Sequence, residues 1–438
     1  ALYSNTVIGY IWRSGRNRMP TRDSVGDSTA LTNASDIFSL IATGTAVSRS
    51  ALLERSGLSR VTVTQRLNAL IAADLIEEAA KTLPSGGRPT RVLAVSPDVG
   101  YVLVANIGEA HLHLALMSPE PALIVQSTLR YEVAEGPAAT LDRIAEGFRR
   151  LLADAGGGNG ILLGVGLSLP APVDYKRGRV VGPSIMRGWD DIDIIGPMAA
   201  HFGAPVYVDN DVNLMTLYEY RRHFQSADDM LFIKVGTGIG AGFIADGKIF
   251  RGAHGASGDI GHIQFDSDDP PLCRCGKLGC VEARAAGWAI ARDLRALGFK
   301  ADNARDVVTL VEQQVPEAIM LLRKAGRVIG EVTADVVSIL NPGLVVVGGT
   351  LARGGDFLLS GIRELVYQRC LPLATRELKI VLAPQQADIA LFGTGQLVVD
   401  NVFSPAGASY LLNRIGSTTV RPAADRPANG SHRMERAS

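Results

Sequence analysis

The sequence predicts a two-lobed α/β protein that is preceded by a small winged helix-turn-helix domain. Strand-like and helix-like segments alternate from about residue 100 to residue 401, which is typical of α/β lobes. Glycine is frequent, at 48 of 438 residues, as expected where many tight turns join strands and helices. Residues 35–96 differ from the rest, because three short helical patterns there are followed by two strand patterns.

Length and composition limit the protein class. A chain of 438 residues is longer than one ordinary domain, and 47% hydrophobic residues suffice for its cores. The net charge is zero, so nucleic-acid binding would depend on a local basic patch. Residues 1–10 lack signal-peptide features and no apolar run reaches eighteen residues, so we expect a cytoplasmic protein without membrane contact.

The expected organisation has five parts. They are a flexible arm over 1–34, a winged helix-turn-helix domain over 35–96, a first lobe over 97–205 that is completed by 395–415, a second lobe over 206–394, and a disordered tail over 416–438. The arm and the tail are rich in small and polar residues without a sustained apolar period. We therefore expect the ordered structure to lie between them.

The N-terminal domain shows helix start signals. Ser35, Ser48 and Ser59 can each cap a helix, because a serine hydroxyl accepts a hydrogen bond from the first-turn backbone. The third helix has an apolar face and an opposite polar face, with no acidic residue before Asp74. Two short helices, a turn and a third helix with an acid-free face are typical of a helix-turn-helix.

A hairpin after the third helix completes a wing. Residues 75–78 and 91–95 can pair as strands, and residues 84–89 form a basic tip. Arg88, between Gly87 and Pro89 in this tip, resembles a wing arginine that enters a minor groove, where the negative potential is concentrated. An alternative is a winged helix used only for protein contacts. Expected DNA contacts are Thr62, Gln65 and Arg66 with bases, and Ser59, Arg60 and Thr64 with phosphates.

The longer C-terminal part contains repeated βββαβα units. This repeat suggests an actin-like ATPase (ribonuclease H-like) architecture, in which two α/β lobes enclose a cleft. Strands are expected at 101–107, 111–117, 123–132, 161–168, 205–208, 231–235, 241–245, 344–347 and 379–382. Helices are expected at 138–153, 282–298, 304–313, 315–340, 355–370 and 393–401.

Three cysteines within eight residues, with one histidine upstream, predict a metal site. The four residues are His262, Cys273, Cys275 and Cys280. A Cys₃His set fills a tetrahedral shell, so we expect one structural Zn²⁺ per chain that does not activate water. Gly276 and Gly279 supply the tight backbone that brings the thiols to one metal. The alternative is a group of reduced, buried cysteines beside an unrelated histidine.

The motif around this knuckle resembles a known family. Gly258-Asp-Ile-Gly-His262, followed by Cys-x-Cys-Gly-x-x-Gly-Cys-x-Glu over 273–282, resembles the signature of the ROK family (repressors, open reading frames and kinases). The resemblance extends from about Val102 to Val399. Family members are sugar kinases or sugar-responsive transcription factors. The resemblance implies that regulatory members carry a winged helix-turn-helix and associate as homodimers or homotetramers.

The resemblance also assigns a sugar pocket. Asp211 matches the general base of family kinases, and Asn210, His262 and Glu282 match sugar contacts. A carboxylate, an amide and an imidazole suit vicinal hydroxyls, which both donate and accept hydrogen bonds. Alternatively, Asn210 and Asp211 only cap the next helix. Two further expected contacts depart from the family: Asp259 replaces a glutamate and Ser184 replaces an asparagine.

The first phosphate loop departs further from the family pattern, which is Asp-x-Gly-x-Thr. This chain has Asn106, Glu109 and Ala110 at the informative positions, so it lacks the Mg²⁺-binding acid and the phosphate-binding hydroxyl. Glu109 would also repel phosphate. The glycines at 236–242 and 348–349 resemble nucleotide loops, although hairpin turns need the same residues for backbone reasons. We therefore expect neither ATP binding nor a catalytic residue.

Together these features predict a DNA-binding transcriptional repressor with a degenerate, sugar-sensing kinase-like domain. Its expected partners are operator double-stranded DNA, a sugar or sugar-phosphate effector, and further copies of the chain. One alternative is an active ATP-dependent hexose kinase with an appended DNA-binding domain and Asp211 as its base. Another is a regulator that responds to a protein partner and not to a small molecule.

Overall fold

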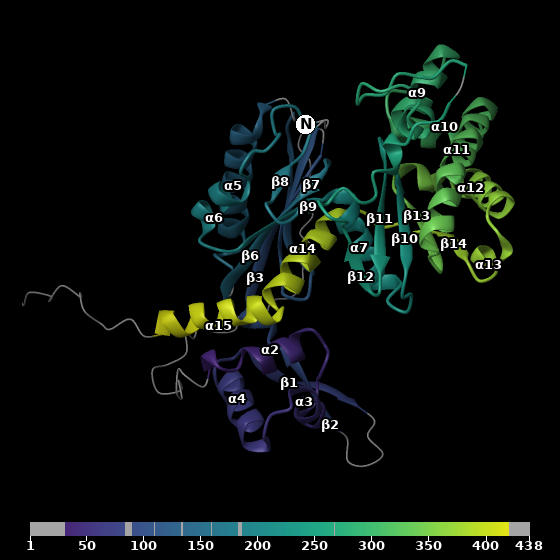
Figure 1. The fold of residues 1–438 in the computed structure, drawn as a ribbon. Helices are drawn as coiled ribbons and strands as arrows, with labels where there is room; N and C mark the ends of the chain where they lie inside the picture. Colours follow the sequence, from purple (N-terminus) through teal and green to yellow (C-terminus); the bar gives the residue numbers. More distant parts are fainter. Residues whose placement is uncertain are drawn as a thin grey trace, which may run out of the picture. The chain divides into compact units, whose positions relative to one another are not determined.

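A computed structural model describes residues 31–419 of the chain, except residues 84–89, 109, 133–134, 159, 183–185 and 267. The described residues form two compact units (Figure 1). The larger unit comprises residues 100–399, and the smaller unit comprises residues 31–99 together with residues 400–419. None of the described helices is both long enough and apolar enough to cross a lipid bilayer.

The smaller unit contains a winged helix-turn-helix. Its elements are α2 (Ser35–Ala42), α3 (Arg49–Ser56), α4 (Arg60–Ala72), β1 (Ile76–Leu83) and β2 (Thr90–Val95). As predicted, the Ser48 and Ser59 hydroxyls cap α3 and α4. The predicted cap at Ser35 is wrong, because α2 already includes Ser35 and its cap position is Ala34. β1 and β2 pair antiparallel, as a wing requires.

One apolar core holds the smaller unit together. Phe38, Leu52, Leu67 and Leu70 from the three helices are fully buried. Gly57 adopts the left-handed conformation (φ 66°) that ends α3 and turns the chain into α4. The N–H of Leu93 in β2 donates to the carbonyl of Val47 at 2.8 Å, which ties the wing to the turn between α2 and α3.

The C-terminal helix packs into this same unit. Helix α15 (Pro405–Thr419) contacts α2, and the rings of Phe38 and Phe403 meet edge to face at 5.4 Å. Two predicted boundaries therefore differ from the structure: residues 400–415 do not complete the first lobe, and residues 416–419 of the predicted tail are helical. At the other end, Leu31 and Ala34 of the predicted arm are buried.

The larger unit is built on two five-stranded sheets of the same design. The first has the order β5-β4-β3-β6-β9 and the second has the order β12-β11-β10-β13-β14. In each sheet an antiparallel β-meander adjoins two parallel strands. The strands are β3 (Gly100–Ile107), β4 (His111–Met117), β5 (Leu123–Arg130), β6 (Ile161–Leu169), β9 (Val206–Asn210), β10 (Met230–Val235), β11 (Ile239–Ala245), β12 (Lys248–Phe250), β13 (Leu344–Gly348) and β14 (Lys379–Leu382). A short hairpin, β7 (Val173–Asp174) with β8 (Arg179–Val180), forms a separate two-stranded sheet that packs into the core of the first sheet.

Helices cover these sheets. They are α5 (Pro137–Asp154), α6 (Ile195–Phe202), α7 (Asp211–His223), α8 (Val281–Ala285), α9 (Gly287–Ala296), α10 (Ala304–Glu312), α11 (Pro316–Leu340), α12 (Asp356–Arg369), α13 (Pro372–Thr375) and α14 (Ile389–Val402). Helix α5 packs on the first sheet and contacts α6, whereas α8 to α12 share the apolar core of the second sheet. The actin-like α/β architecture predicted from the repeat is thus confirmed.

The local predictions differ from the structure at identifiable points. The helix expected over 282–298 is divided into α8 and α9, because Ala286 between them is extended (φ −73°, ψ 160°). Helix α14 starts four residues earlier than expected. Helix α6, which was not predicted, has only one fully buried side chain, Met198, so its sequence offers little amphipathic period.

Candidate metal centre, effector cleft and DNA-contacting helix

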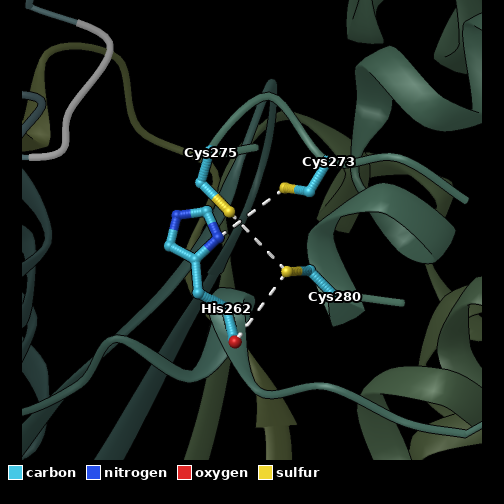
Figure 2. Close-up of side chains that lie close together, drawn as sticks. All are labelled: His262, Cys273, Cys275 and Cys280. Carbon is cyan, nitrogen blue, oxygen red and sulfur yellow. Dashed lines mark hydrogen bonds between the residues drawn. The ribbon is translucent and has the colours of Figure 1, made fainter. Parts of the chain in front are cut away.

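The four predicted metal ligands meet at one point. The Nδ1 or Nε2 atom of His262 and the Sγ atoms of Cys273, Cys275 and Cys280 all lie within 4.8 Å of one another (Figure 2). His262 Nδ1 lies 3.7 Å from Cys273 Sγ, and Cys275 Sγ lies 3.7 Å from Cys280 Sγ. Zn–S bonds of about 2.3 Å at tetrahedral angles put two sulfurs about 3.8 Å apart. The donor set therefore fits a tetrahedral Zn²⁺ in both chemistry and spacing.

Local backbone structure positions these ligands. Gly276 and Gly279 both have positive φ angles, 89° and 76°, which confirms the predicted need for glycine there. The Cys273 N–H donates to the Lys277 carbonyl at 2.8 Å and closes a turn around Cys275. Cys280 directly precedes helix α8, so the metal site is joined to the core of the second sheet.

Burial affects the protonation of the thiols. Burial and the neighbouring thiols raise the pKa of Cys280 to about 12, and burial also raises the pKa of Cys273. Cysteine binds metal as a thiolate, so these thiols need a cation nearby to ionise at neutral pH. The second nitrogen of His262, Nε2, lies 3.9 Å from Asp259 Oδ1. This distance is longer than a hydrogen bond, so Asp259 is not tied to the imidazole, and its predicted role remains the sugar contact.

A charged network lies at the carboxyl end of β9. Asp209 is 1% exposed and forms an ion pair of 2.7 Å with Arg251, which follows β12. Its other oxygen accepts from the Asn213 side chain at 3.0 Å. Arg251 also lies over the Tyr175 ring at 3.9 Å. No local sequence pattern indicates this partner, because Arg251 is 42 residues away from Asp209.

The residue that matches the kinase base is paired with a lysine. Asp211 Oδ2 lies 2.5 Å from Lys234 Nζ, and their side chains are only 12% and 26% exposed. Lys234 interrupts the buried strand β10 immediately before the glycine hairpin. Its position in an otherwise apolar segment was the only sequence signal for this contact. A general base must lie within hydrogen-bond reach of the sugar hydroxyl, and here one oxygen of the carboxylate is already occupied by the ammonium group.

Asn210 caps a helix, as the structural alternative predicted. Its side-chain oxygen accepts from the N–H groups of Val212 and Asn213, at 2.9 and 3.3 Å, at the start of α7. Its amide nitrogen donates to the carbonyl of Ala171 at 3.0 Å. Sugar binding by Asn210 therefore stays a prediction, and the amide already has these protein partners.

Glu282 supports the glycine hairpin between β10 and β11. Its Oε2 accepts from the Ile239 N–H at 3.0 Å, and its Oε1 accepts from the Trp288 indole at 3.4 Å. A Cβ on Gly238 would lie 2.5 Å from the same carboxylate, so a larger residue there would displace the Glu282 side chain. The carboxylate predicted to contact sugar thus already links the metal knuckle to the hairpin.

Two other glycines of this hairpin, Gly240 and Gly242, pack against α7. A Cβ on Gly240 would come within 3.0 Å of Val212, and one on Gly242 within 2.1 Å of Thr216. Close packing therefore accounts for these glycines without a nucleotide. At the first phosphate loop, Asn106 is the next-to-last residue of β3 and pairs with Ser168 of β6. Glu109 and the sugar-site residue Ser184 lie outside the described residues.

A pocket lies beside the turn at Gly348 and Gly349. Its volume is about 250 Å³, and it is lined by Met215, Arg305, Gly348, Gly349, Thr350, Arg353, Ala383, Pro384, Gln385, Gln386 and Ile389. Small-molecule pockets are commonly about 300–1,000 Å³. Arg353 is also paired with Glu312 at 3.0 Å. The pocket therefore offers limited room for a nucleotide.

The face of α4 that is open to solvent differs from the predicted one. Arg60, Thr64 and Gln65 are exposed as expected. Arg66 is instead paired with Asp36 of α2 at 2.6 Å, and the Thr62 hydroxyl lies 2.9 Å from that of Ser59. The base contact predicted for Arg66 requires this ion pair to open. Arg88 lies outside the described residues.

The sequence model of the ROK family matches residues 105–401. The chain is 25% identical over 373 residues to a xylose repressor of Caldicellulosiruptor bescii, covering 82% of this chain and 93% of that protein. It is 27% identical over 316 residues to a glucokinase of Halalkalibacterium halodurans, covering 69% and 95%. The chain also resembles the solved structure of a ROK family transcriptional regulator, which is a homologue of the Escherichia coli MLC protein. The match covers 89% of this chain and 100% of that chain, with a TM-score of 0.75 and 24% sequence identity. The repressor match is longer than residues 105–401, so it extends into the flanking residues.

Proposed function

This chain belongs to the ROK family, and we propose that it is a DNA-binding transcriptional repressor whose kinase-like domain senses a sugar or sugar phosphate. The observation that supports this proposal most is the exposed, acid-free face of α4, capped by Ser59 and followed by a β-hairpin wing. This is the geometry in which a helix enters the major groove. The longer match to the xylose repressor than to the glucokinase agrees with it.

The condition of the phosphate-transfer residues favours a sensor over an enzyme. Asn106 replaces the acid of the first phosphate loop, and a neutral amide binds Mg²⁺ less well than a carboxylate. The Asp211 carboxylate is engaged by Lys234. The pocket of about 250 Å³ beside Gly349 is small for a nucleoside triphosphate. These three features disfavour metal binding, proton transfer and nucleotide binding, respectively.

In this proposal the metal has a structural role. His262 and the three cysteines of the knuckle would hold one Zn²⁺ in a closed shell, which leaves no position for water or substrate. Glu282, two residues after Cys280, then connects the knuckle to the hairpin, because its carboxylate accepts a hydrogen bond from the Ile239 N–H. The cleft residues would bind an effector, and the effector would shift the population toward a conformation that does not fit DNA.

We also propose that the chain acts as a homodimer or homotetramer. Two copies present two α4 helices, and a protein with a two-fold axis matches a palindromic operator. Selection of DNA fragments by the full-length chain tests this directly. The expected result is enrichment of an inverted repeat, which Gln65→Ala weakens and Gln313→Ala, an exposed glutamine of the larger unit, does not.

The same assay examines the effector. Addition of sugars and sugar phosphates to the bound complex should release DNA with one compound, and Asp259→Ala should remove that response while the metal content is unchanged. Failure to enrich any sequence over competitor DNA would refute the repressor proposal. Enrichment that no sugar reverses would favour a protein partner as the signal.

The glucokinase match supports a second candidate, an ATP-dependent sugar kinase with an appended DNA-binding domain. Asp211 at the start of α7 would be its general base. A coupled assay of ADP release over a panel of hexoses decides between the candidates. Turnover that Asp211→Asn abolishes would establish the kinase, and its absence at millimolar ATP supports the sensor.

A further inference from the structure

An exposed valine lies at the N-terminal end of α4. Val61 is 76% exposed, whereas Val63, two residues later, is 2% exposed and belongs to the core. Helix propensity does not explain a valine at this position, because valine has a lower helix propensity than alanine. Nothing in the core of the smaller unit requires an apolar group at position 61. The side chain is therefore available to a ligand of the helix.

The other exposed residues on the same face of α4 as Val61 are polar. Thr64, Gln65 and Asn68 are also exposed, and they follow at the i+3, i+4 and i+7 positions, which share one helical face. Arg66, by contrast, is held against α2 by Asp36. The face that α4 offers to a groove thus contains one apolar side chain among hydroxyl and amide groups.

Among the base edges of the major groove, the prominent apolar group is the 5-methyl of thymine. In a helix-turn-helix, the N-terminal residues of the second helix contact base edges. We propose that Val61 contacts the 5-methyl group of a thymine in each operator half-site and so determines specificity there. This inference rests on the proposed DNA-binding function.

The expected effect of this contact on the dissociation constant follows from the apolar area that it buries. Burying one methyl group against an apolar side chain contributes enough to change a dissociation constant about fourfold. The effect is confined to one base pair per half-site, because only one side chain on this face is apolar. Gln65, one turn further along, would contact a neighbouring adenine through its amide.

The experiment removes the methyl group from the DNA. The enriched operator is resynthesised with deoxyuridine in place of each thymine in turn, and affinities of the full-length chain are measured by fluorescence anisotropy. The expected result is a loss of about fourfold at one position per half-site. Val61→Ala should bind the thymine and uracil operators equally at that position, while Val61→Ile should still distinguish them.

Two controls separate the possible failures. Val181→Ala removes another exposed valine, 47% exposed in the larger unit, and should leave every thymine effect unchanged. An unchanged unfolding temperature of Val61→Ala excludes misfolding as the cause. If an operator is enriched but no thymine is sensitive to uracil, or if the sensitivity persists in Val61→Ala, the inference is overturned. If no operator is enriched, the proposed function itself fails.

Discussion

The ion pair between Asp211 and Lys234 allows a quantitative prediction for stability. Replacing Lys234 by methionine keeps most of the side-chain volume but leaves the Asp211 carboxylate, which is 12% exposed, without its cation. Hydrogen bonds to charged groups contribute about 1.5–3 kcal/mol, and breaking a fully buried pair costs about 3–5 kcal/mol. Because this pair is largely but not fully buried, we expect a loss of about 2.5 kcal/mol.

This loss should be visible as a change in melting temperature. At about 2 cal/mol/K per residue, the unfolding entropy of a unit of this size converts the loss to about 4 °C. Differential scanning calorimetry of the full-length chain measures it. Asp211→Asn in the Lys234→Met background should recover part of the stability, because it removes the uncompensated charge.

A surface pair in the same unit serves as the control. Arg353 and Glu312 are separated by 3.0 Å, but both side chains are more than half exposed. Breaking that pair with Arg353→Met should change stability by less than about 1 kcal/mol. If Lys234→Met costs no more than Arg353→Met, or if the two changes at Asp211 and Lys234 are simply additive, the reasoning about this pair is refuted.

Three further predictions concern other sites. Purified protein should contain about one zinc per chain by mass spectrometry. The variant Cys275→Ser should lose the metal and unfold at a lower temperature, whereas Cys370→Ala should keep the metal. Burial raises the pKa of Glu219 to about 7, so the native state holds a proton that the unfolded state loses near pH 4.5. The free energy of unfolding should therefore fall by about 3 kcal/mol as pH rises from about 4.5 to 7, and denaturant titrations of Glu219→Gln should lack this slope. Asp36→Asn should free Arg66 for its predicted base contact, so that operator affinity rises in anisotropy titrations. An unchanged affinity would contradict the role of this pair.

Local signals in the sequence predict much of the fold. Short apolar runs locate nearly every strand of the two sheets, because strands that are buried on both faces need continuous apolar residues. The serines at 48 and 59 and the glycine at 57 mark the ends of α3 and α4, because caps depend on neighbouring residues only. The metal ligands are also predictable, because their spacing along the chain is short.

The contacts that sequence reasoning missed join distant segments. The partner of Asp211 is 23 residues away, and the partner of Arg66 is 30 residues away on another helix. Glu282 illustrates the same limit: its family position suggests a sugar contact, yet its carboxylate accepts from Ile239. No local pattern records which of several polar groups will be closest after folding.

The docking of α15 on α2 has a consequence for biosynthesis. Phe38, near the beginning of the chain, is covered by Phe403, near its end, so the smaller unit is assembled from segments that a ribosome makes hundreds of residues apart. An apolar surface around Phe38 stays open to solvent, or to chaperones, throughout translation of the two lobes. A nascent or prematurely terminated chain therefore lacks the last layer of its winged unit.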